Sequence, residues 1–171
     1  LDYYLELSKK ESDYLLYEEP MGTVSGVQTQ IPVLLSEYQF QSKEDVDAYL
    51  ELMKTTPDYF NSLIAFEQEK AQKGLFMASY TADTVIEQCQ AFIDMGDSNY
   101  LISTFVDRIQ KLTDLSESEK SDYIQKNAYM LKTYVLPAYQ QLIKTVVELK
   151  DSGKNEEGLC YLPNGKEYYE L

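Results

Sequence analysis

The side chains in this chain that could carry out chemistry are carboxylates, tyrosines and cysteines, because the sequence contains no histidine. The absence of histidine excludes serine–histidine and cysteine–histidine nucleophile pairs and His-Glu-x-x-His zinc motifs. It also removes the side chain best suited to proton transfer near neutral pH. We therefore assign no catalytic residue from the sequence.

The two cysteines do not form a metal-binding pattern. Cys89 and Cys160 lie far apart, and neither belongs to a Cys-x-x-Cys pair, so a zinc ribbon is excluded. Cys89 is in register with apolar neighbours and is predicted to be a small buried thiol. A disulfide between the two cysteines stays open at this point.

Carboxylates are abundant, but their spacing does not predict an acid–base pair. Neighbouring pairs occur at Glu18 with Glu19, Glu67 with Glu69, and Glu156 with Glu157. Adjacent or every-second residues of a helix do not face each other, whereas acid–base chemistry needs two carboxylates facing one cleft. We interpret these pairs as solvated surface. The acidic residues around Gly96 lack the length and the closing glutamate of a calcium loop.

Tyrosine is the most unusual component, with 16 tyrosines and no tryptophan. Tyrosine offers an apolar body with a polar tip, which suits a binding surface for a peptide or a sugar. Tyr49, Tyr134 and Tyr139 fall on apolar helix faces and are predicted to be at least half-buried. Tyr161, Tyr168 and Tyr169 cluster near the C-terminus and are the better candidates for an exposed role.

Composition predicts one compact domain over residues 1–171. The 29 acidic and 15 basic residues give a formal net charge of -14, which disfavours nucleic acid and anionic lipid as partners. The sequence lacks an apolar run of about 18 residues, so membrane insertion is not expected. The chain begins without a methionine inside a helical pattern, and we expect it to be a fragment of a longer protein.

The longest helical pattern covers residues 116–153 and predicts the central helix of an all-α domain. Ser116 and Glu119 have the spacing of a capping box, which marks the helix start. Apolar residues then recur every three or four positions, a wide stripe that predicts contact with several other helices. Pro137 predicts a bend near residues 133–137. The stripe consists of Ile124, Ala128, Leu131, Val135, Ala138, Leu142, Val146 and Leu149, widened by Tyr134, Tyr139, Ile143 and Val147.

Shorter helical patterns precede this helix and favour an up-and-down array. Helices are predicted from Ser42 to about residue 54, from residues 56–57 to Gly74, from about residue 81 to residue 95, and from residues 97–98 to about residue 112. Residues 1–19 are typical of the end of a helix, which Pro20 stops.

Two segments depart from the helical pattern. Residues 20–32 contain no charge, which predicts a long irregular loop, and Pro32 suits the first position of a short buried helical stretch over residues 31–40. Beyond Gly153, the pair Asn164-Gly165 predicts a tight turn after a short extended segment. The last residues could pair back as a hairpin or begin a helix.

Several short motifs are distributed over nearly the whole chain. They are Ser25-Gly26-Val27-Gln28, Pro32-Val33-Leu34-Leu35, Tyr38-Gln39-Phe40, Asp45-Val46-Asp47-Ala48-Tyr49-Leu50, Val135-Leu136-Pro137-Ala138-Tyr139, Gly158-Leu159, Leu162-Pro163 and Gly165-Lys166-Glu167-Tyr168-Tyr169. Together they resemble a bacterial family known as domain of unknown function 885.

This resemblance implies an all-helical, zincin-like metallopeptidase whose His-Glu-x-x-Pro-Gly-His-type zinc motif follows the Tyr-Tyr segment. Because this chain has no histidine, no zinc ligand or catalytic glutamate is carried over onto it, and zinc is expected only in the parent protein. The chain would form one wall of the substrate channel and pack against the remainder of the parent chain. The resemblance also implies an extracytoplasmic or cell-surface parent in a Gram-positive bacterium.

Under this hypothesis, the loop over residues 22–30 and the turn over residues 158–169 are the expected places of peptide contact. The candidate contact residues are Gly26, Gln28, Gln30, Tyr161, Tyr168 and Tyr169. The alternative is a free-standing helical binding module for a peptide or sugar. The first hypothesis predicts an open reading frame that continues past Leu171 into a zinc motif, and the second predicts a stop codon nearby.

Overall fold

The computed structural model describes residues 4–6, 9, 12, 14–154 and 156–170, and within these ranges every regular element is helical. The prediction of an all-α fold is therefore confirmed. The α-helices are α2 (Val27–Glu37), α3 (Lys43–Gln72), α4 (Ser79–Asp94), α5 (Tyr100–Ile109), α6 (Glu117–Met130), α7 (Leu136–Leu149) and α8 (Gly165–Tyr169). A π-helical turn at Leu131–Val135 joins α6 to α7, and 3-10 turns lie at Leu15–Tyr17, Gly96–Ser98 and Leu159–Tyr161.

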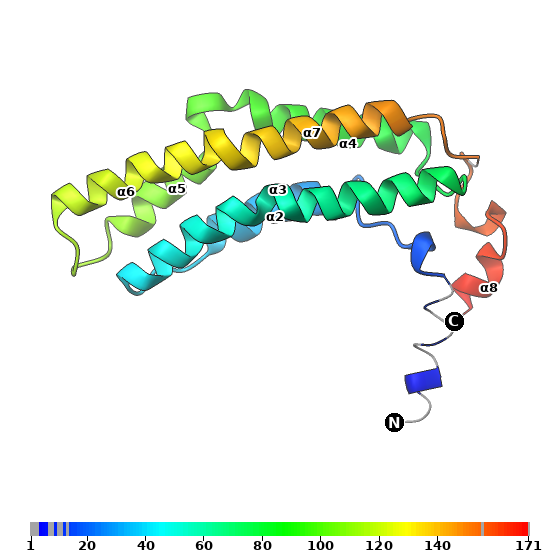
Figure 1. Ribbon diagram of the computed structural model, residues 1–171, viewed down its shortest axis with the longest axis horizontal. Helices are drawn as coiled ribbons and strands as arrows, with labels where there is room; N and C mark the ends of the chain where they lie inside the picture. The colour runs from blue at the N-terminus through cyan, green and yellow to red at the C-terminus, as the bar shows by residue number, and fades with distance from the viewer. Residues whose placement is uncertain (1–3, 7–8, 10–11, 13, 155, 171) are drawn as a thin grey trace.

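The helices form an elongated bundle in which α3 runs alongside the continuous helix made by α6, the π-helical turn and α7 (Figure 1). Helix α7 packs against α3 and α4, α6 packs against α3 and α5, and α2 packs against α4 and α5. The described N-terminal residues and α8 lie at the same end of the bundle (Figure 1). This end carries the candidate functional site described below.

The predicted central helix is confirmed. Leu131, Val135 and Leu142 are 0% exposed and Ala138 is 5% exposed. The Ser116 backbone amide donates to Glu119 Oε2 over 2.9 Å, and the Glu119 amide donates to Ser116 Oγ over 3.3 Å, as the capping box requires. The π-helical turn ends two residues before Pro137, whose missing N–H interrupts regular α-helical bonding. Val147 is the exception to the stripe, because it is 55% exposed.

Helix α3 is one continuous helix, so the prediction of two helices divided near residues 54–57 is wrong. Pro57 lies inside the helix and removes one backbone hydrogen bond, a cost of about 3 kcal/mol or more. The buried face nevertheless continues on both sides of Pro57, with Met53 before it and Phe60 after it. Each such side chain contributes about 1.5 to 3 kcal/mol on burial, so packing against α7 outweighs the local break.

Helix α2 starts earlier than predicted, at Val27 with Gly26 as its N-cap. The expected irregular loop up to Pro32 is therefore wrong for residues 27–32, and Pro32 lies in the helix interior. Val27 and Ile31 are spaced one helical turn apart and both pack against the core. Burial of this apolar stripe favours the helix over a loop.

Other boundaries differ by a few residues or change type. Asn99, rather than residues 97–98, caps α5, and its side chain accepts a 2.9 Å hydrogen bond from the Leu101 amide. The expected extended segment before Asn164 is instead a 3-10 turn, and the following residues form α8 and not a strand. Asn164 itself adopts a left-handed turn conformation with φ 55°. The helix expected over residues 1–19 lies partly outside the described residues. Leu171 also lies outside them.

The two cysteines are both free, Cys89 buried and Cys160 exposed, so the disulfide left open by the sequence does not form. Burial raises the pKa of the Cys89 thiol to about 12, which keeps the thiol protonated.

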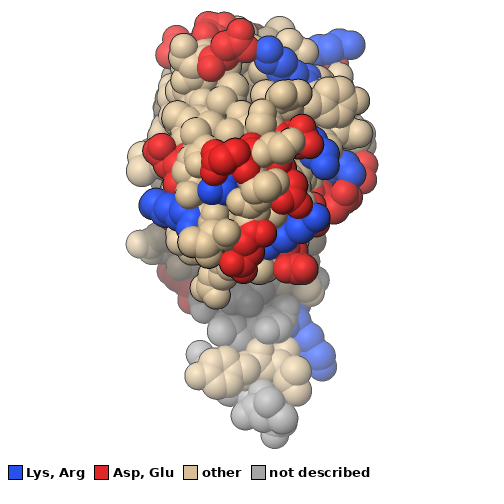
Figure 2. Space-filling view, turned by 90° about the vertical axis from the view of Figure 1, so that its left-hand side faces the viewer, with Lys and Arg blue, Asp and Glu red and all other residues tan. Residues whose placement is uncertain are grey.

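In the described part of the chain, no helix combines the length and the apolar character needed to cross a membrane. Acidic and basic side chains are interspersed over the end of the bundle where α3 and α6 begin (Figure 2).

Candidate functional site

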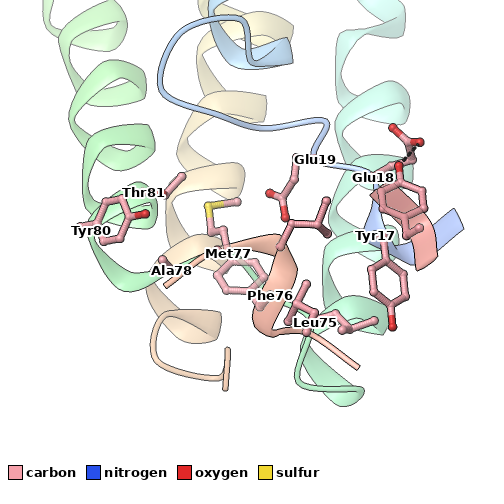
Figure 3. Close-up of a pocket in the computed structure, with 13 residues that line it drawn as sticks. Tyr17, Glu18, Glu19, Leu75, Phe76, Met77, Ala78, Tyr80 and Thr81 are labelled. Carbon is pink, nitrogen blue, oxygen red and sulfur yellow. Dashed lines mark hydrogen bonds between the residues drawn. The ribbon is translucent and has the colours of Figure 1, made fainter. Parts of the chain in front are cut away.

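A pocket of about 490 Å³ lies at the end of the bundle that carries α8 (Figure 3). We call it the end pocket. Three segments far apart in the sequence contribute to it: the N-terminal segment before α2, the connection between α3 and α4, and the region from Gly158 to α8. Its lining residues are Tyr17, Glu18, Glu19, Leu75, Phe76, Met77, Ala78, Tyr80, Thr81, Gly158, Leu159, Leu162 and Tyr168.

The connection between α3 and α4 forms an apolar floor. Gly74 ends α3 with φ 73°, a left-handed conformation that glycine adopts without strain. Leu75, Phe76 and Met77 follow and are 7%, 3% and 4% exposed. The chain after α7 lies directly against this connection, because a Cβ atom at Gly153 would lie 2.5 Å from the Phe76 carbonyl oxygen.

Hydrogen bonds hold the C-terminal segment in place beside the floor. The Ser79 amide donates to Glu156 Oε2 over 3.0 Å, and the Ser79 hydroxyl donates to Glu156 Oε1 over 2.8 Å. Glu156 therefore binds the first turn of α4, where a carboxylate also interacts favourably with the helix dipole. The Lys154 amide adds a 3.3 Å hydrogen bond to the Gly74 carbonyl.

Tyrosine rings form one side of the pocket. The ring centroids of Tyr14, Tyr17 and Tyr168 lie 5.4 to 5.6 Å apart, within the range of favourable aromatic pairs. The Tyr168 hydroxyl donates to Glu18 Oε1 over 2.8 Å, and the Tyr17 hydroxyl donates to the Pro163 carbonyl. These contacts tie the N-terminal segment to α8.

The buried side chain of Lys70 holds the N-terminal segment against the bundle. The Lys70 side chain is 0% exposed, and its Nζ atom donates to the Glu18 carbonyl over 2.6 Å and pairs with Glu19 Oε1 over 3.3 Å. A lysine buried this fully is held only where such partners compensate its lost hydration. Figure 3 shows the Glu19 side chain extending toward Met77 and Phe76, whereas the Glu18 carboxylate points away from them.

Glu67 lies one turn before Lys70 and is 1% exposed, so its interpretation as solvated surface is wrong. Neither carboxylate oxygen has a hydrogen-bond partner within the described residues. Burial raises the pKa of Glu67 to about 7, although Lys70 partly opposes the shift and Glu19 adds to it. Sequence spacing could not show this, because burial on a helix depends on which face its neighbours cover.

The predicted contact residues do not come together in one place. Tyr168 lines the end pocket, whereas Tyr161 and Tyr169 are 65% and 83% exposed outside it. Gly26, Gln28 and Gln30 also lie outside the pocket lining. They belong to the start of α2, which packs against α4 and α5.

The residues at the start of α2 have structural roles. Gln28 is 3% exposed, and its side-chain amide donates to the Gly22 carbonyl over 2.7 Å and to Gln88 Oε1 over 2.8 Å. A Cβ atom at Gly26 would lie 2.1 Å from Gln28 Oε1, so this close packing requires glycine. Gln30 is exposed, and its side-chain amide donates to the Ser25 carbonyl over 2.6 Å. The expected display of free backbone groups over residues 22–30 is therefore not found at residues 27–30, which are helical.

The end pocket contains residues that sequence reasoning missed, above all Glu19, Met77 and Tyr80. One signal was present: the connection after Gly74 is an uncharged, largely apolar stretch where a helix–helix turn is usually polar. Nothing in the sequence indicated that residues 17–19 and 158–168 would converge on it.

The described residues do not fit a bound metal ion. They contain no group of three or more cysteine, aspartate or glutamate side chains positioned to hold one.

Comparison with known proteins gives a family and a fold. A family model described as "Bacterial protein of unknown function (DUF885)" matches residues 1–171. The structure is similar to the crystal structure of "the putative lipoprotein from Colwellia psychrerythraea", with 18% sequence identity and a TM-score of 0.83. The similarity covers 88% of this chain and 26% of that chain, so this chain spans about a quarter of that protein's length. No curated protein matches the sequence.

Proposed function

The chain belongs to the bacterial DUF885 family, and from this premise we propose that it is a non-catalytic helical part of a zinc metallopeptidase-like hydrolase. In this proposal the end pocket forms part of the wall of the substrate channel, and the zinc ion and its catalytic groups belong to the remainder of the longer protein. The family membership agrees with the motif resemblance identified in the sequence.

The observation that carries the proposal is the position of the end pocket. It lies where the N-terminal segment, the connection between α3 and α4, and α8 meet. A longer chain would continue from this same end of the bundle, since the described N-terminal residues and α8 both lie there (Figure 1). The similar Colwellia protein is about four times the length of the matched region, which is compatible with such an arrangement.

The composition of the pocket suits part of a peptide. Its volume of about 490 Å³ falls in the range of ligand-binding pockets. Phe76, Met77 and Leu159 supply apolar contact area, while Glu19 and the tyrosine hydroxyls supply polar groups at the side. This arrangement can bind and orient a side chain.

We further propose that the longer protein is extracytoplasmic. The support is the description of the structurally similar Colwellia protein as a "putative lipoprotein". Fractionation of cells that produce the longer protein, followed by detection of this chain, tests the proposal. Recovery from the cytoplasm alone would contradict it.

The functional proposal is tested with the protein encoded by the complete open reading frame. We expect peptide hydrolysis that a zinc chelator abolishes and added zinc restores. Within this chain, Tyr80→Ala should lower kcat/KM for a peptide while leaving the Tm unchanged, because Tyr80 lines the pocket and is 63% exposed.

Tyr129→Ala is the matched control, since Tyr129 is 58% exposed on α6 and lies outside the pocket. A reading frame that stops soon after Leu171, or equal kinetics for the two variants, would contradict the proposal. Peptide binding without any hydrolysis would instead favour a free-standing binding module.

A further inference from the structure

The lining of the end pocket, taken as a whole, carries an excess of negative charge. Glu18 and Glu19 are the charged residues that line it, and Lys70 approaches Glu19 from the bundle interior. Together with the buried Glu67, these side chains carry a net charge of -1 if Glu67 is protonated and -2 if it is ionised. A cation is therefore the ligand charge that the pocket favours.

Glu19 is the group best placed to meet such a cation. Its side chain is 51% exposed and extends toward Phe76 and Met77 (Figure 3). Within the described residues, the ion pair of Oε1 with Lys70 is the polar contact of this carboxylate. The second carboxylate oxygen is therefore available to a ligand, whereas the Glu18 carboxylate accepts the Tyr168 hydroxyl.

The surroundings of Glu19 select among cations. Phe76 and Met77 of the apolar floor, together with Leu159, suit a long aliphatic stem. A guanidinium binds a carboxylate best through both oxygens, but Lys70 already occupies Oε1. A compact ammonium group needs only one oxygen, and nearby tyrosine rings add favourable contact for a cation.

We propose that the end pocket is a subsite for a lysine side chain of a peptide, with its stem on the floor of Phe76 and Met77 and its ammonium group at Glu19. This inference rests on the proposed function and names the substrate class of the same pocket. The inference concerns binding, so it can be tested separately from hydrolysis.

The test uses the methionine methyl groups as probes. The protein is labelled with ¹³C at these methyl groups and titrated by NMR with N-acetyl-Ala-Lys-Ala-amide and with the same peptide carrying norleucine or arginine in place of lysine. We expect the lysine peptide to shift the Met77 methyl signal and to bind about three- to fivefold more tightly than the norleucine peptide, as a partly exposed ion pair allows. The Met130 methyl signal, from the far half of the bundle, should not move.

Glu19→Gln should remove the preference for lysine over norleucine, whereas Glu44→Gln, an exposed carboxylate at the start of α3, should retain it. Circular dichroism establishes that each variant is folded. Should Glu19→Gln fail to fold, the preference of the unsubstituted protein must still decline as sodium chloride is raised from about 0.05 to about 0.5 M.

Three results would overturn the lysine subsite. They are equal affinity of the lysine and norleucine peptides, a preference for lysine that persists in folded Glu19→Gln, and an unshifted Met77 methyl signal. Tighter binding of the arginine peptide would overturn the choice of lysine. The proposed function fails separately, if pocket variants of the longer protein leave peptide hydrolysis unchanged. If Tyr80→Ala lowers peptide hydrolysis but lysine and norleucine peptides are hydrolysed equally, the proposed channel wall is supported and the lysine subsite is contradicted.

Discussion

The Tyr139 hydroxyl donates a 2.7 Å hydrogen bond to the backbone carbonyl of Gln28. In an α-helix this carbonyl would accept from the amide four residues later, but that residue is Pro32, which has no N–H. Tyr139 lies on α7 and is 0% exposed. A side chain from the central helix thus supplies the hydrogen bond that allows α2 to continue through a proline.

We predict that Tyr139→Phe lowers the free energy of unfolding by about 1 to 3 kcal/mol, because it leaves a buried carbonyl without its donor. Urea unfolding followed by circular dichroism measures the change. The same substitution in a Pro32→Ala background should cost less, because alanine at this position restores a backbone amide. Equal costs in the two backgrounds would show that the hydroxyl is not coupled to the proline.

Gln28 is predicted to be structural and Gln30 to be dispensable for stability. Gln28→Ala removes two hydrogen bonds from a buried side chain and leaves the Gly22 carbonyl oxygen and Gln88 Oε1 without their donor. We expect a loss of about 1 to 3 kcal/mol and a lower Tm, with peptide kinetics of the longer protein unchanged in the folded fraction. Gln30→Ala, at an exposed position of the same helix, should change stability by less than about 0.5 kcal/mol.

A change in kcat/KM for Gln28→Ala with an unchanged Tm would contradict this structural role. It would support the original expectation that the start of α2 contacts substrate.

The central helix was predictable because its signals are local. A capping box marks its start, and its apolar stripe is long enough to show the helical period without knowledge of the neighbours. The continuity of α3 and the early start of α2 were not predictable in this way. Pro57 and Pro32 indicate breaks locally, and only packing against α7 and the hydrogen bond from Tyr139 make helix the favoured state.

The end pocket was largely beyond sequence reasoning. Of the six candidate contact residues, Tyr168 is the one that lines it. The others lie in uncharged or aromatic segments, and the sequence of such segments does not indicate which of them meet in space. Glu67 and Lys70 show the same limit, because a charged residue in a helical pattern is normally solvated and these two are buried.

Glu67 is predicted to make the protein less stable as pH rises from about 4.5 to about 7. Its pKa is raised from 4.5 in the unfolded chain to about 7 in the folded protein, so the folded state holds the proton more tightly. The stabilisation is fully present below the lower value and is lost as pH rises through the higher one. At about 1.4 kcal/mol per pKa unit, the loss amounts to about 3 kcal/mol.

Urea unfolding of Glu67→Gln between pH 5 and pH 8 tests this linkage. Glutamine resembles the protonated carboxyl, so the variant should match the unsubstituted protein near pH 5 and exceed its stability near pH 8. Glu87→Gln, at an exposed position of α4, should follow the unsubstituted protein throughout. Parallel pH profiles for Glu67→Gln and the unsubstituted protein would disprove the role of Glu67.

Lys70 is predicted to hold the N-terminal segment against the bundle rather than to stabilise the bundle itself. Lys70→Met keeps the apolar stem but removes the donor to the Glu18 carbonyl and the ion pair with Glu19. Replacing a buried charge by an apolar side chain is often neutral or favourable for global stability, so we expect a small change in Tm. The released segment should instead be cleaved by chymotrypsin at Tyr17 about tenfold faster, since cleavage follows local opening.

Lys73→Met on the same helix is the control, because Lys73 is 59% exposed and pairs only with Glu69 among the described residues. Unchanged cleavage at Tyr17, or a large fall in Tm with cleavage spread over the whole chain, would show that Lys70 belongs to the global core and does not act as a local anchor for the wall of the end pocket.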